Sequence, residues 1–246
     1  MYRLTSKENS LSAPSPDSDP IEALAARFGV TPIDAELWWQ ALTHPSYANE
    51  VPGSKHYERL EFLGDAILGA LVADELYRRR PDAPPGELTF LRSVLIRRET
   101  LADWAEGVGL RDLVRVGRSA RGFDAVGWRT VLADVFEALL GVIWLEHGLE
   151  PVQAFVRKTV VDRIPSYADA RRELEPKNVL QERLASDGSE VAYRVVHQDE
   201  HGVTVTVSWP GGEASATARS KREAAVEAAR RALDAIDAES GAGAHA

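Results

Sequence analysis

The stretch HYERLEFLGDAILG, residues 56–69, contains three acidic residues within an otherwise apolar run. Successive residues of an α-helix are about 100° apart, so Glu58, Glu61 and Asp65 fall on one stripe of the predicted helix. Apolar side chains occupy most of the remaining circumference, and a helix that is apolar nearly all round is usually buried. Carboxylates gathered in a buried place lose hydration and repel one another. We therefore expect a cation to bind at this stripe.

A second acidic cluster lies in VLADVFEALLG, residues 131–141. Asp134 and Glu137 are three residues apart, on one face of another apolar helix. Two such helices can supply the oxygen ligands that Mg²⁺ prefers, and Glu87, at a predicted helix start after APPG, is a further candidate. Any one of these acids alone is more often an ordinary surface or helix-start residue. Together, and at these spacings, they favour a metal site.

Length and composition limit the class of protein. The chain has 246 residues, of which 44% are hydrophobic, so we expect two domains with real cores. It has no cysteine, which excludes disulfides and thiolate zinc sites. No apolar run is long enough to span a membrane, and residues 1–20 lack the apolar centre of a signal peptide, so we expect a cytoplasmic protein. The net charge of −9 has the wrong sign for a nucleic-acid-binding protein.

The pattern along the chain divides it into five segments. Residues 1–20 and 238–246 are polar or small, and we expect both to be disordered. Residues 21–163 repeat apolar positions at three- and four-residue steps, which predicts an all-α domain. Residues 164–174 are expected to form a linker. Residues 175–237 give the order α-β-β-β-α, with a tight turn at PGG, which predicts a small α+β domain.

Other catalytic motifs are absent from the sequence. None of the six histidines has a glutamate three residues before it, which argues against a ferritin-like di-iron site. There is no P-loop, no G-x-S-x-G elbow and no H-E-x-x-H. His44 is more typical of a helix cap or a residue at the core edge than of a metal ligand. Trp38, Trp39, Trp104 and Trp144 follow helical apolar patterns and are predicted to lie in the core.

Several blocks of the sequence, taken in order, resemble a known family. HYERLEFLGDAILG is similar to the signature segment of ribonuclease III, and LTHPSYANE, GELTFLRSVLIRRETLA and LADVFEALLGVIWLEHG resemble its other blocks. EPKNVLQE and RSKREAAVEAARRAL resemble the two ends of that family's double-stranded-RNA-binding domain. The resemblance covers about residues 21–237. It implies two domains: an all-α endonuclease domain followed by a small α+β (α-β-β-β-α) double-stranded-RNA-binding domain.

The resemblance also implies a function for each acidic cluster. In this family the matching positions hold Mg²⁺, for which Mn²⁺ can substitute; they are Glu61, Asp65, Asp134 and Glu137. Asp65 and Glu137 are the implied catalytic residues. Glu58 and Glu87 match acidic positions that place RNA or outer-shell water. The implied enzyme is an endoribonuclease that cleaves both strands of double-stranded RNA, leaves 5′-phosphate and 3′-hydroxyl ends, and processes ribosomal RNA precursors and structured messengers.

A homodimer is implied as well, with Phe62 matching an aromatic residue that inserts into the partner subunit. Periodicity alone is equally compatible with an intramolecular core position for Phe62. The chain departs from the family pattern at Tyr57, where Asn is usual, and in the loop VHQDEHGV, which lacks the usual Pro. The basic run of the last helix lacks its later Lys. These departures concern RNA binding rather than the metal ligands.

The predicted RNA-binding residues lie in the second domain. Lys221 and Arg222, in the first turn of the last helix, can pair with phosphates. Gln181 can reach a minor-groove edge or a 2′-hydroxyl, and His201 is a candidate substitute for the usual loop histidine. The alternative for Lys221 and Arg222 is an ordinary solvated helix start. Residues 175–237 contain 11 acidic and eight basic residues, a net charge of −3, so binding requires one locally basic face.

Three functions of different classes remain open on the sequence. The first is a Mg²⁺-dependent endoribonuclease specific for double-stranded RNA. The second is a catalytically inactive double-stranded-RNA-binding dimer, which predicts lost ligands although every expected acid is present. The third is an unrelated metal-dependent phosphohydrolase of small molecules, which leaves the second domain without a purpose. We favour the first, against which the acidic pI of about 5.3 counts.

Overall fold

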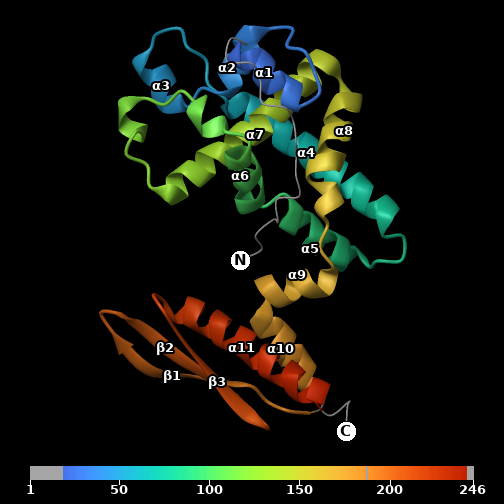
Figure 1. Cartoon of the computed structure of the whole chain (residues 1–246), viewed down its shortest axis with the longest axis vertical. Helices are drawn as coiled ribbons and strands as arrows, with labels where there is room; N and C mark the ends of the chain where they lie inside the picture. Colours follow the sequence, from blue (N-terminus) through green and yellow to red (C-terminus); the bar gives the residue numbers. More distant parts are fainter. Residues whose placement is uncertain (1–18, 187, 243–246) are drawn as a thin grey trace. The chain divides into compact units, whose positions relative to one another are not determined.

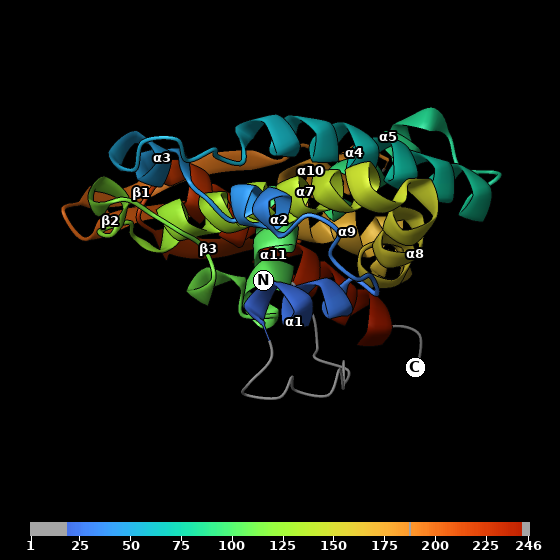
Figure 2. The same ribbon diagram turned by 90° about the horizontal axis from the view of Figure 1, so that it is seen from above.

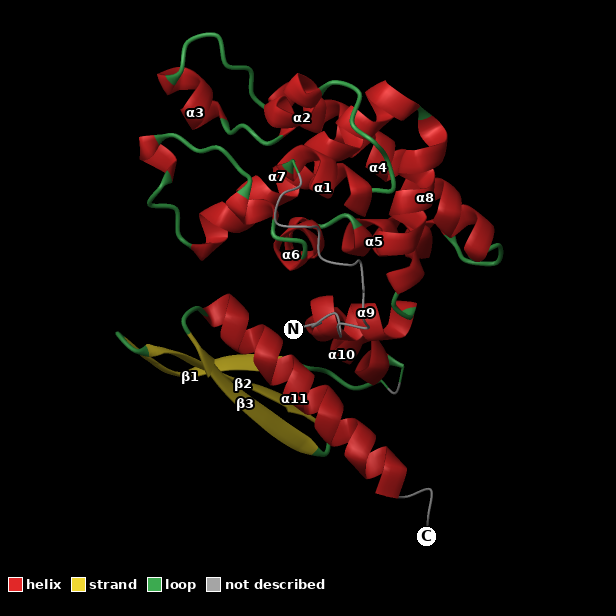
Figure 3. Ribbon diagram, turned by 45° about the horizontal axis from the view of Figure 1, so that its top comes forward, coloured by secondary structure: helices red, strands yellow, loops and turns green. Residues whose placement is uncertain are grey.

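The computed structural model describes residues 19–186 and 188–242, so the expectations for residues 1–18 and 243–246 lie outside the described residues. The chain forms two compact units that divide between Ile164 and Pro165. Figure 3 shows that the first unit is helical and that the strands belong to the second. The first unit contains α1 Pro20–Arg27, α2 Ala35–Ala41, α3 Pro45–Glu50, α4 Glu58–Arg79, α5 Pro85–Leu95, α6 Arg98–Gly107, α7 Ala125–His147 and α8 Leu149–Thr159, with short 3-10 helices at Leu110–Asp112, Arg118–Ala120 and Val161–Arg163.

Helix α7 is the centre of the first unit. Its buried residues run from Trp128 to Ile143 without favouring one face, as expected for a helix that is apolar all round. It packs against α2, α4, α6 and α8, and most extensively against α4, which lies alongside it in Figures 1 and 2. Aromatic rings from four elements meet beside it: Phe28, Trp104, Phe136 and Phe155. The two acidic clusters of the sequence thus lie on neighbouring helices.

Two glycines let α4 and α7 approach closely. A Cβ atom at Gly64 would lie 1.8 Å from the carbonyl oxygen of Glu137, and one at Gly141 would lie 2.5 Å from the carbonyl oxygen of Leu60. No side chain fits at either place without moving a backbone. The glycines of LEFLGD and EALLG therefore bring the two acid-bearing helices into backbone contact at the acidic clusters.

The prediction that α4 is buried nearly all round was wrong. Glu58 and Asp65 are exposed, and Phe62 is 79% exposed. Ala66, Ala70 and Tyr77 are also exposed on this helix. The reason is that α7 covers only one side of α4, which leaves an apolar stripe on the other side. We call these four residues, Phe62, Ala66, Ala70 and Tyr77, the α4 stripe.

Other local predictions can be compared with the structure. His44 is the N-cap of α3 and its Nδ1 accepts a hydrogen bond from the Ser46 amide, 3.0 Å away, so the prediction of a capping role is confirmed. Trp38 and Trp104 are buried as predicted. Trp39 and Trp144 are only half-buried, and the Arg115 guanidinium lies 3.7 Å from the centre of the Trp39 ring.

The second unit is an antiparallel sheet covered on one face by helices, which confirms the predicted fold class. Its strands, β1 Ala192–Asp199, β2 Gly202–Trp209 and β3 Gly212–Ala218, lie in the order β1-β2-β3. Helix α11, Lys221–Ala242, packs on β2 and β3, and α10, Pro176–Ala185, packs on α11. The alternating valines of β2 and the alanines of α11 form its core. Hydroxyl pairs such as Thr204 with Thr217, 2.8 Å apart, line β2 and β3 at partly exposed positions.

Two segments are more helical than expected. Within residues 164–174, expected to be a linker, α9 spans Tyr167–Leu174. Arg171 forms ion pairs with Glu175 and Glu182, and Arg172 forms ion pairs with two aspartates of α11, so these side chains tie α9 to the second unit. Helix α11 continues to Ala242, into a segment expected to be disordered. Its Ala-rich sequence has a high intrinsic helix propensity.

Candidate functional site

Three carboxylates meet where α4 and α7 touch. Glu61 comes from α4, and Asp134 and Glu137 come from successive turns of α7. One oxygen of each lies within 4.8 Å of the others, and all three side chains are half-buried. We call Glu61, Asp134 and Glu137 the acidic trio. The structure thus brings together three of the four metal ligands expected from the sequence.

The acidic trio carries like charges without a matching cation. Burial, followed by the charge of Asp134, raises the pKa of Glu61 to about 7. Burial, followed by the charges of Asp65 and Glu61, raises the pKa of Glu137 to about 8. Arg98, at the start of α6, counteracts these shifts only partly. The ionised trio is therefore unfavourable unless a further positive charge is present.

The donor set fits a hard divalent cation. Carboxylate oxygens are the ligands that Mg²⁺ and Mn²⁺ prefer. Within the described residues, no group donates a hydrogen bond to the side-chain carboxylate of Glu61 or Glu137, and neither carboxylate forms a salt bridge, so these carboxylate oxygens are available for an ion. Asp134 accepts one hydrogen bond, from the Tyr57 hydroxyl at 3.2 Å.

The other predicted acidic residues lie outside the trio. Asp65 is exposed one turn beyond Glu61, and its charge raises the pKa of both Glu61 and Glu137. Glu58 is exposed, with an oxygen 3.5 Å from His56 Nδ1. Glu87, in the first turn of α5, lies 3.9 Å from an Arg80 nitrogen. Asp65 is therefore available to bind an ion together with the trio, whereas Glu87 forms an ion pair with Arg80.

The predicted RNA-binding residues are exposed on the second unit. Gln181 is exposed on α10, and His201 is exposed in the two-residue turn between β1 and β2. Lys221 and Arg222 are exposed in the first turn of α11, which Ser220 caps by accepting a hydrogen bond from the Glu223 amide at 3.2 Å. These four side chains are accessible to a ligand.

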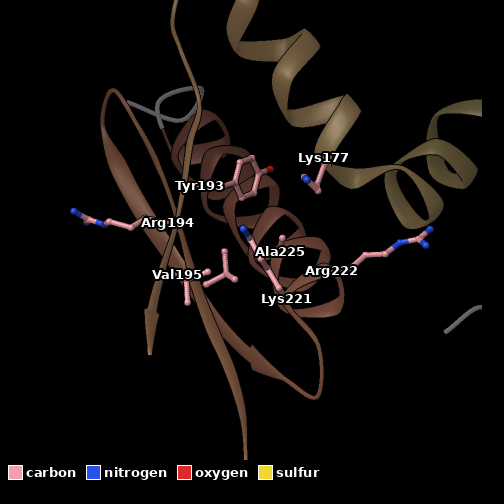
Figure 4. Close-up of a pocket in the computed structure, with 8 residues that line it drawn as sticks. Lys177, Tyr193, Arg194, Val195, Lys221, Arg222 and Ala225 are labelled. Atoms are coloured by element: carbon pink, nitrogen blue, oxygen red, sulfur yellow. The ribbon is translucent and has the colours of Figure 1, made fainter. Parts of the chain in front are cut away.

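A pocket of about 280 Å³ beside Lys221 adds a residue that the sequence did not reveal. Lys177 lines it from the first turn of α10, with its ammonium 4.8 Å from the centre of the Tyr193 ring. In Figure 4 the Lys177 ammonium lies near the Tyr193 ring and Arg194 projects to the opposite side. The only sequence signal for Lys177 was its place after Pro176 at the helix start, a place that many solvated lysines share.

Comparisons with known proteins agree with both units. Residues 34–164 match the ribonuclease-III-like family and residues 176–236 match the double-stranded RNA binding motif. Ribonuclease 3 of Lactobacillus johnsonii is 38% identical over 215 residues, or 86% of this chain and 95% of that protein. Ribonuclease 3 of Streptomyces coelicolor is 36% identical, over 84% of this chain and 76% of that one. The nuclease domain of ribonuclease III from Campylobacter jejuni is 30% identical, with a TM-score of 0.53, over 59% of this chain and 99% of that one.

A helical nuclease domain with an acidic group, followed by a double-stranded-RNA-binding domain, defines a class of RNA-cleaving enzymes. The two family models, and the sequence identity to ribonuclease 3 proteins over most of the chain, agree with that class. The chain belongs to the ribonuclease III family and is an endoribonuclease. Within the described residues, each helix is either too short or too polar to cross a membrane.

Proposed function

We propose that this chain hydrolyses phosphodiester bonds in both strands of double-stranded RNA, with Mg²⁺ as cofactor or Mn²⁺ in its place. The proposed products carry 5′-phosphate and 3′-hydroxyl ends, and the proposed physiological substrates are ribosomal RNA precursors and structured messengers. The observation that carries the proposal is the acidic trio, which has no salt-bridge partner among the described residues. Membership of the ribonuclease III family supports the reaction class. The lack of cysteine supports a cytoplasmic location.

In this proposal each acid has a separate role. Glu61, Asp134 and Glu137 hold the ion with one oxygen each. Asp65, exposed one turn along α4, would be the fourth ligand, and Asp65 and Glu137 would be the acids on which catalysis most depends. The bound ion supplies positive charge for the phosphoryl oxygens and makes water a better nucleophile at neutral pH. Glu58 and Glu87 place the RNA or water farther from the reacting phosphate.

The second unit supplies affinity for the duplex. Double-stranded RNA is recognised mainly by its shape, through phosphates and 2′-hydroxyls. Lys177, Lys221 and Arg222 surround one pocket and form a local basic face on an otherwise acidic domain. Gln181 and His201, which are both exposed, would contact the minor groove. The negative net charge has the wrong sign for RNA binding, but this cluster of basic side chains would provide a locally positive surface for the phosphates.

The cleavage test uses a long RNA duplex incubated with the full chain and Mg²⁺, Mn²⁺, Ca²⁺ or EDTA. We expect cleavage with Mg²⁺ and Mn²⁺ and products with 5′-phosphate ends. Ca²⁺, which is larger and less exacting in geometry, should support binding with little turnover. Binding without cleavage in every metal would instead indicate the inactive double-stranded-RNA-binding dimer.

The binding test replaces Lys221 and Arg222 by alanine. Each lost phosphate contact should reduce the slope of log affinity against log salt concentration by about 1. Lys158→Ala, at an exposed lysine of α8 in the other unit, is the charge control. If the double variant bound the duplex as tightly as the parent at every salt concentration, this face would not be the RNA-binding face.

We propose further that the chain works as a homodimer joined through the α4 stripe. Phe62 is 79% exposed beside Glu61, and large exposed apolar side chains in a row mark association surfaces. Sedimentation of the full chain should show a dimer, and Phe62→Ala should dissociate it. Ile33→Ala removes an exposed apolar side chain elsewhere and should leave the dimer intact. A monomeric parent at micromolar concentration would refute this proposal.

A further inference from the structure

Tyr57 connects the two helices that carry the acidic trio. Its carbonyl oxygen accepts hydrogen bonds from the amides of Leu60 and Glu61, at 2.8 and 2.9 Å, and so forms the first turn of α4. Its own amide donates to the carbonyl oxygen of Thr43 at 3.1 Å. Its hydroxyl donates to Asp134 Oδ2 on α7 at 3.2 Å. One residue thus sets the start of the helix that bears Glu61 and contacts the carboxylate of Asp134.

The Tyr57 ring has little freedom to move. The residue is only 3% exposed. The His44 ring meets it edge-on, with ring centres 5.8 Å apart, and Phe123 packs on the His44 ring in the same manner at 5.6 Å. His44 is itself fixed as the N-cap of α3. The hydroxyl of Tyr57 therefore reaches Asp134 from a rigid support.

Asp134 is the only member of the acidic trio whose carboxylate accepts a hydrogen bond from the described residues. A carboxylate that accepts one fixed hydrogen bond has a restricted rotamer, and the remaining lone pairs then point in set directions. Partners of this kind orient metal ligands and commonly contribute 10- to 100-fold to metal affinity.

We propose that Tyr57 is a positioning residue of the metal site, which orients the Asp134 carboxylate toward the divalent ion and does not contact the RNA. This inference rests on the proposed function, because it requires that the acidic trio holds the ion. Tyr57 is also the position at which the signature segment departs from its usual Asn, and its contact with Asp134 assigns this departure to a predicted metal ligand rather than to RNA binding, as the sequence had suggested. The tyrosine at this position reaches across to α7 through its hydroxyl.

The test replaces Tyr57 by phenylalanine, which removes one oxygen and keeps the ring and its packing. Titration of the RNA-free full chain with Mn²⁺, followed by calorimetry, should show roughly 10-fold weaker binding. In cleavage assays the Mg²⁺ concentration for half-maximal rate should rise by a similar factor, while the rate at saturating Mg²⁺ stays near the parental value. Tyr47→Phe, which removes a hydroxyl from the half-buried tyrosine of α3, is the matched control.

A second variant separates positioning from a general structural effect. In an Asp134→Ala background, Tyr57→Phe should weaken Mn²⁺ binding no further, because the oxygen that accepts its hydrogen bond has gone. Fully additive losses, or unchanged Mn²⁺ affinity of the single Tyr57→Phe variant, would overturn the inference and leave the proposed function standing. A parent chain that does not bind Mn²⁺ would overturn both.

Discussion

Glu61 and Glu75 lie near opposite ends of helix α4. They differ in whether neighbouring arginines compensate the negative charge of the carboxylate. Glu75 is 4% exposed, more deeply buried than Glu61. Nevertheless its pKa is lowered, chiefly because Arg157 donates hydrogen bonds to it, with Arg79 contributing. Among the described residues, no arginine donates a hydrogen bond to Glu61, and its pKa is raised to about 7. Burial raises the pKa of Glu61, whereas at Glu75 the hydrogen bonds from arginines outweigh the effect of burial.

The difference separates a structural acid from a functional one. Arg157 Nε lies 2.8 Å and Arg79 Nε 3.2 Å from the Glu75 carboxylate, and Arg79 extends the group to Asp162 at 2.8 Å. This group, which we call the Glu75 ion-pair group, is complete within one chain. In the acidic trio, by contrast, the described residues do not supply enough positive charge to compensate the carboxylates. We propose that a bound cation supplies the rest. The following four predictions test this contrast.

The largest effect is expected for Glu137→Gln. The amide keeps the shape but removes a charged oxygen of the trio, so cleavage of an RNA duplex should fall by roughly 100-fold or more, as for other groups that act in the transition state. Gel-shift affinity for the duplex should persist. Asp65→Asn should behave similarly. Near-parental cleavage by either variant, or loss of folding in both, would mean that these acids are structural.

The counterpart at the other end of α4 is Glu75→Gln. Arg157 and Arg79 would then donate hydrogen bonds to a neutral amide instead of a carboxylate. These bonds are weaker, so the free energy of unfolding should fall by about 2 kcal/mol. Chemical denaturation measures this loss, and cleavage by the folded variant should remain close to parental. A stable variant with impaired cleavage would reverse the assignment of the two acids.

The pH dependence of stability should differ in sign between the two ends. In EDTA, the raised pKa values of Glu61 and Glu137, about 7 and about 8 against 4.5 for an ordinary Glu, stabilise the fold at low pH, and this stability is lost as the pH rises through those values. The lowered pKa of Glu75 acts in the opposite direction, and its contribution is lost as the pH falls below about 4.5.

Thermal melts at several pH values test this prediction. In EDTA the melting temperature of the parent should fall between about pH 4.5 and pH 8, and saturating Mg²⁺ should restore it. Glu137→Gln should show a flatter decline over this range, whereas Glu75→Gln should lower the melting temperature throughout it without changing the slope, and should approach the parent only in acid, where the parent loses the contribution of Glu75. Identical alkaline declines in Glu137→Gln and the parent would contradict the prediction.

The smallest effect on stability is expected for Asp162, the exposed member of the Glu75 ion-pair group. Asp162 is largely exposed and pairs with Arg79, and exposed ion pairs typically contribute up to about 1 kcal/mol. Asp162→Asn should therefore lower the free energy of unfolding by less than Glu75→Gln, and high salt should reduce the difference from the parent. A loss equal to that of Glu75→Gln would show that Asp162 is as important as the buried acid.

Sequence periodicity was sufficient to predict the helical first domain and to place Asp134 and Glu137 on one helix face, because residues three apart share a face. The prediction that Glu61 joins them in one site came from the resemblance to a known family. Periodicity could not distinguish Glu61 from Glu75. Both are acids in the same apolar helix, and the cation that compensates Glu75, Arg157, is 82 positions away in the chain.

Exposure was also hard to predict from sequence. The apolar pattern around Phe62 is the same whether the covering surface comes from this chain or from a partner, so α4 was predicted to be more buried than it is. Lys177 escaped notice because its relation to Tyr193 and Lys221 depends on how the sheet and two helices meet. Such contacts across elements carry no local periodicity.

The glycine contact between α4 and α7 has a consequence for the order in which the protein opens. Backbones in direct contact at Gly64 and Gly141 cannot separate locally without disrupting the centre of the domain. Amide hydrogens of α4 and α7 near this contact should therefore exchange with solvent only through global unfolding of the helical domain. Many enzymes place their catalytic groups on loops that open first. Here two of the candidate metal ligands, Asp134 and Glu137, lie in the interior of α7, in what should be the last region to exchange, so fraying of the helix ends would leave both in place.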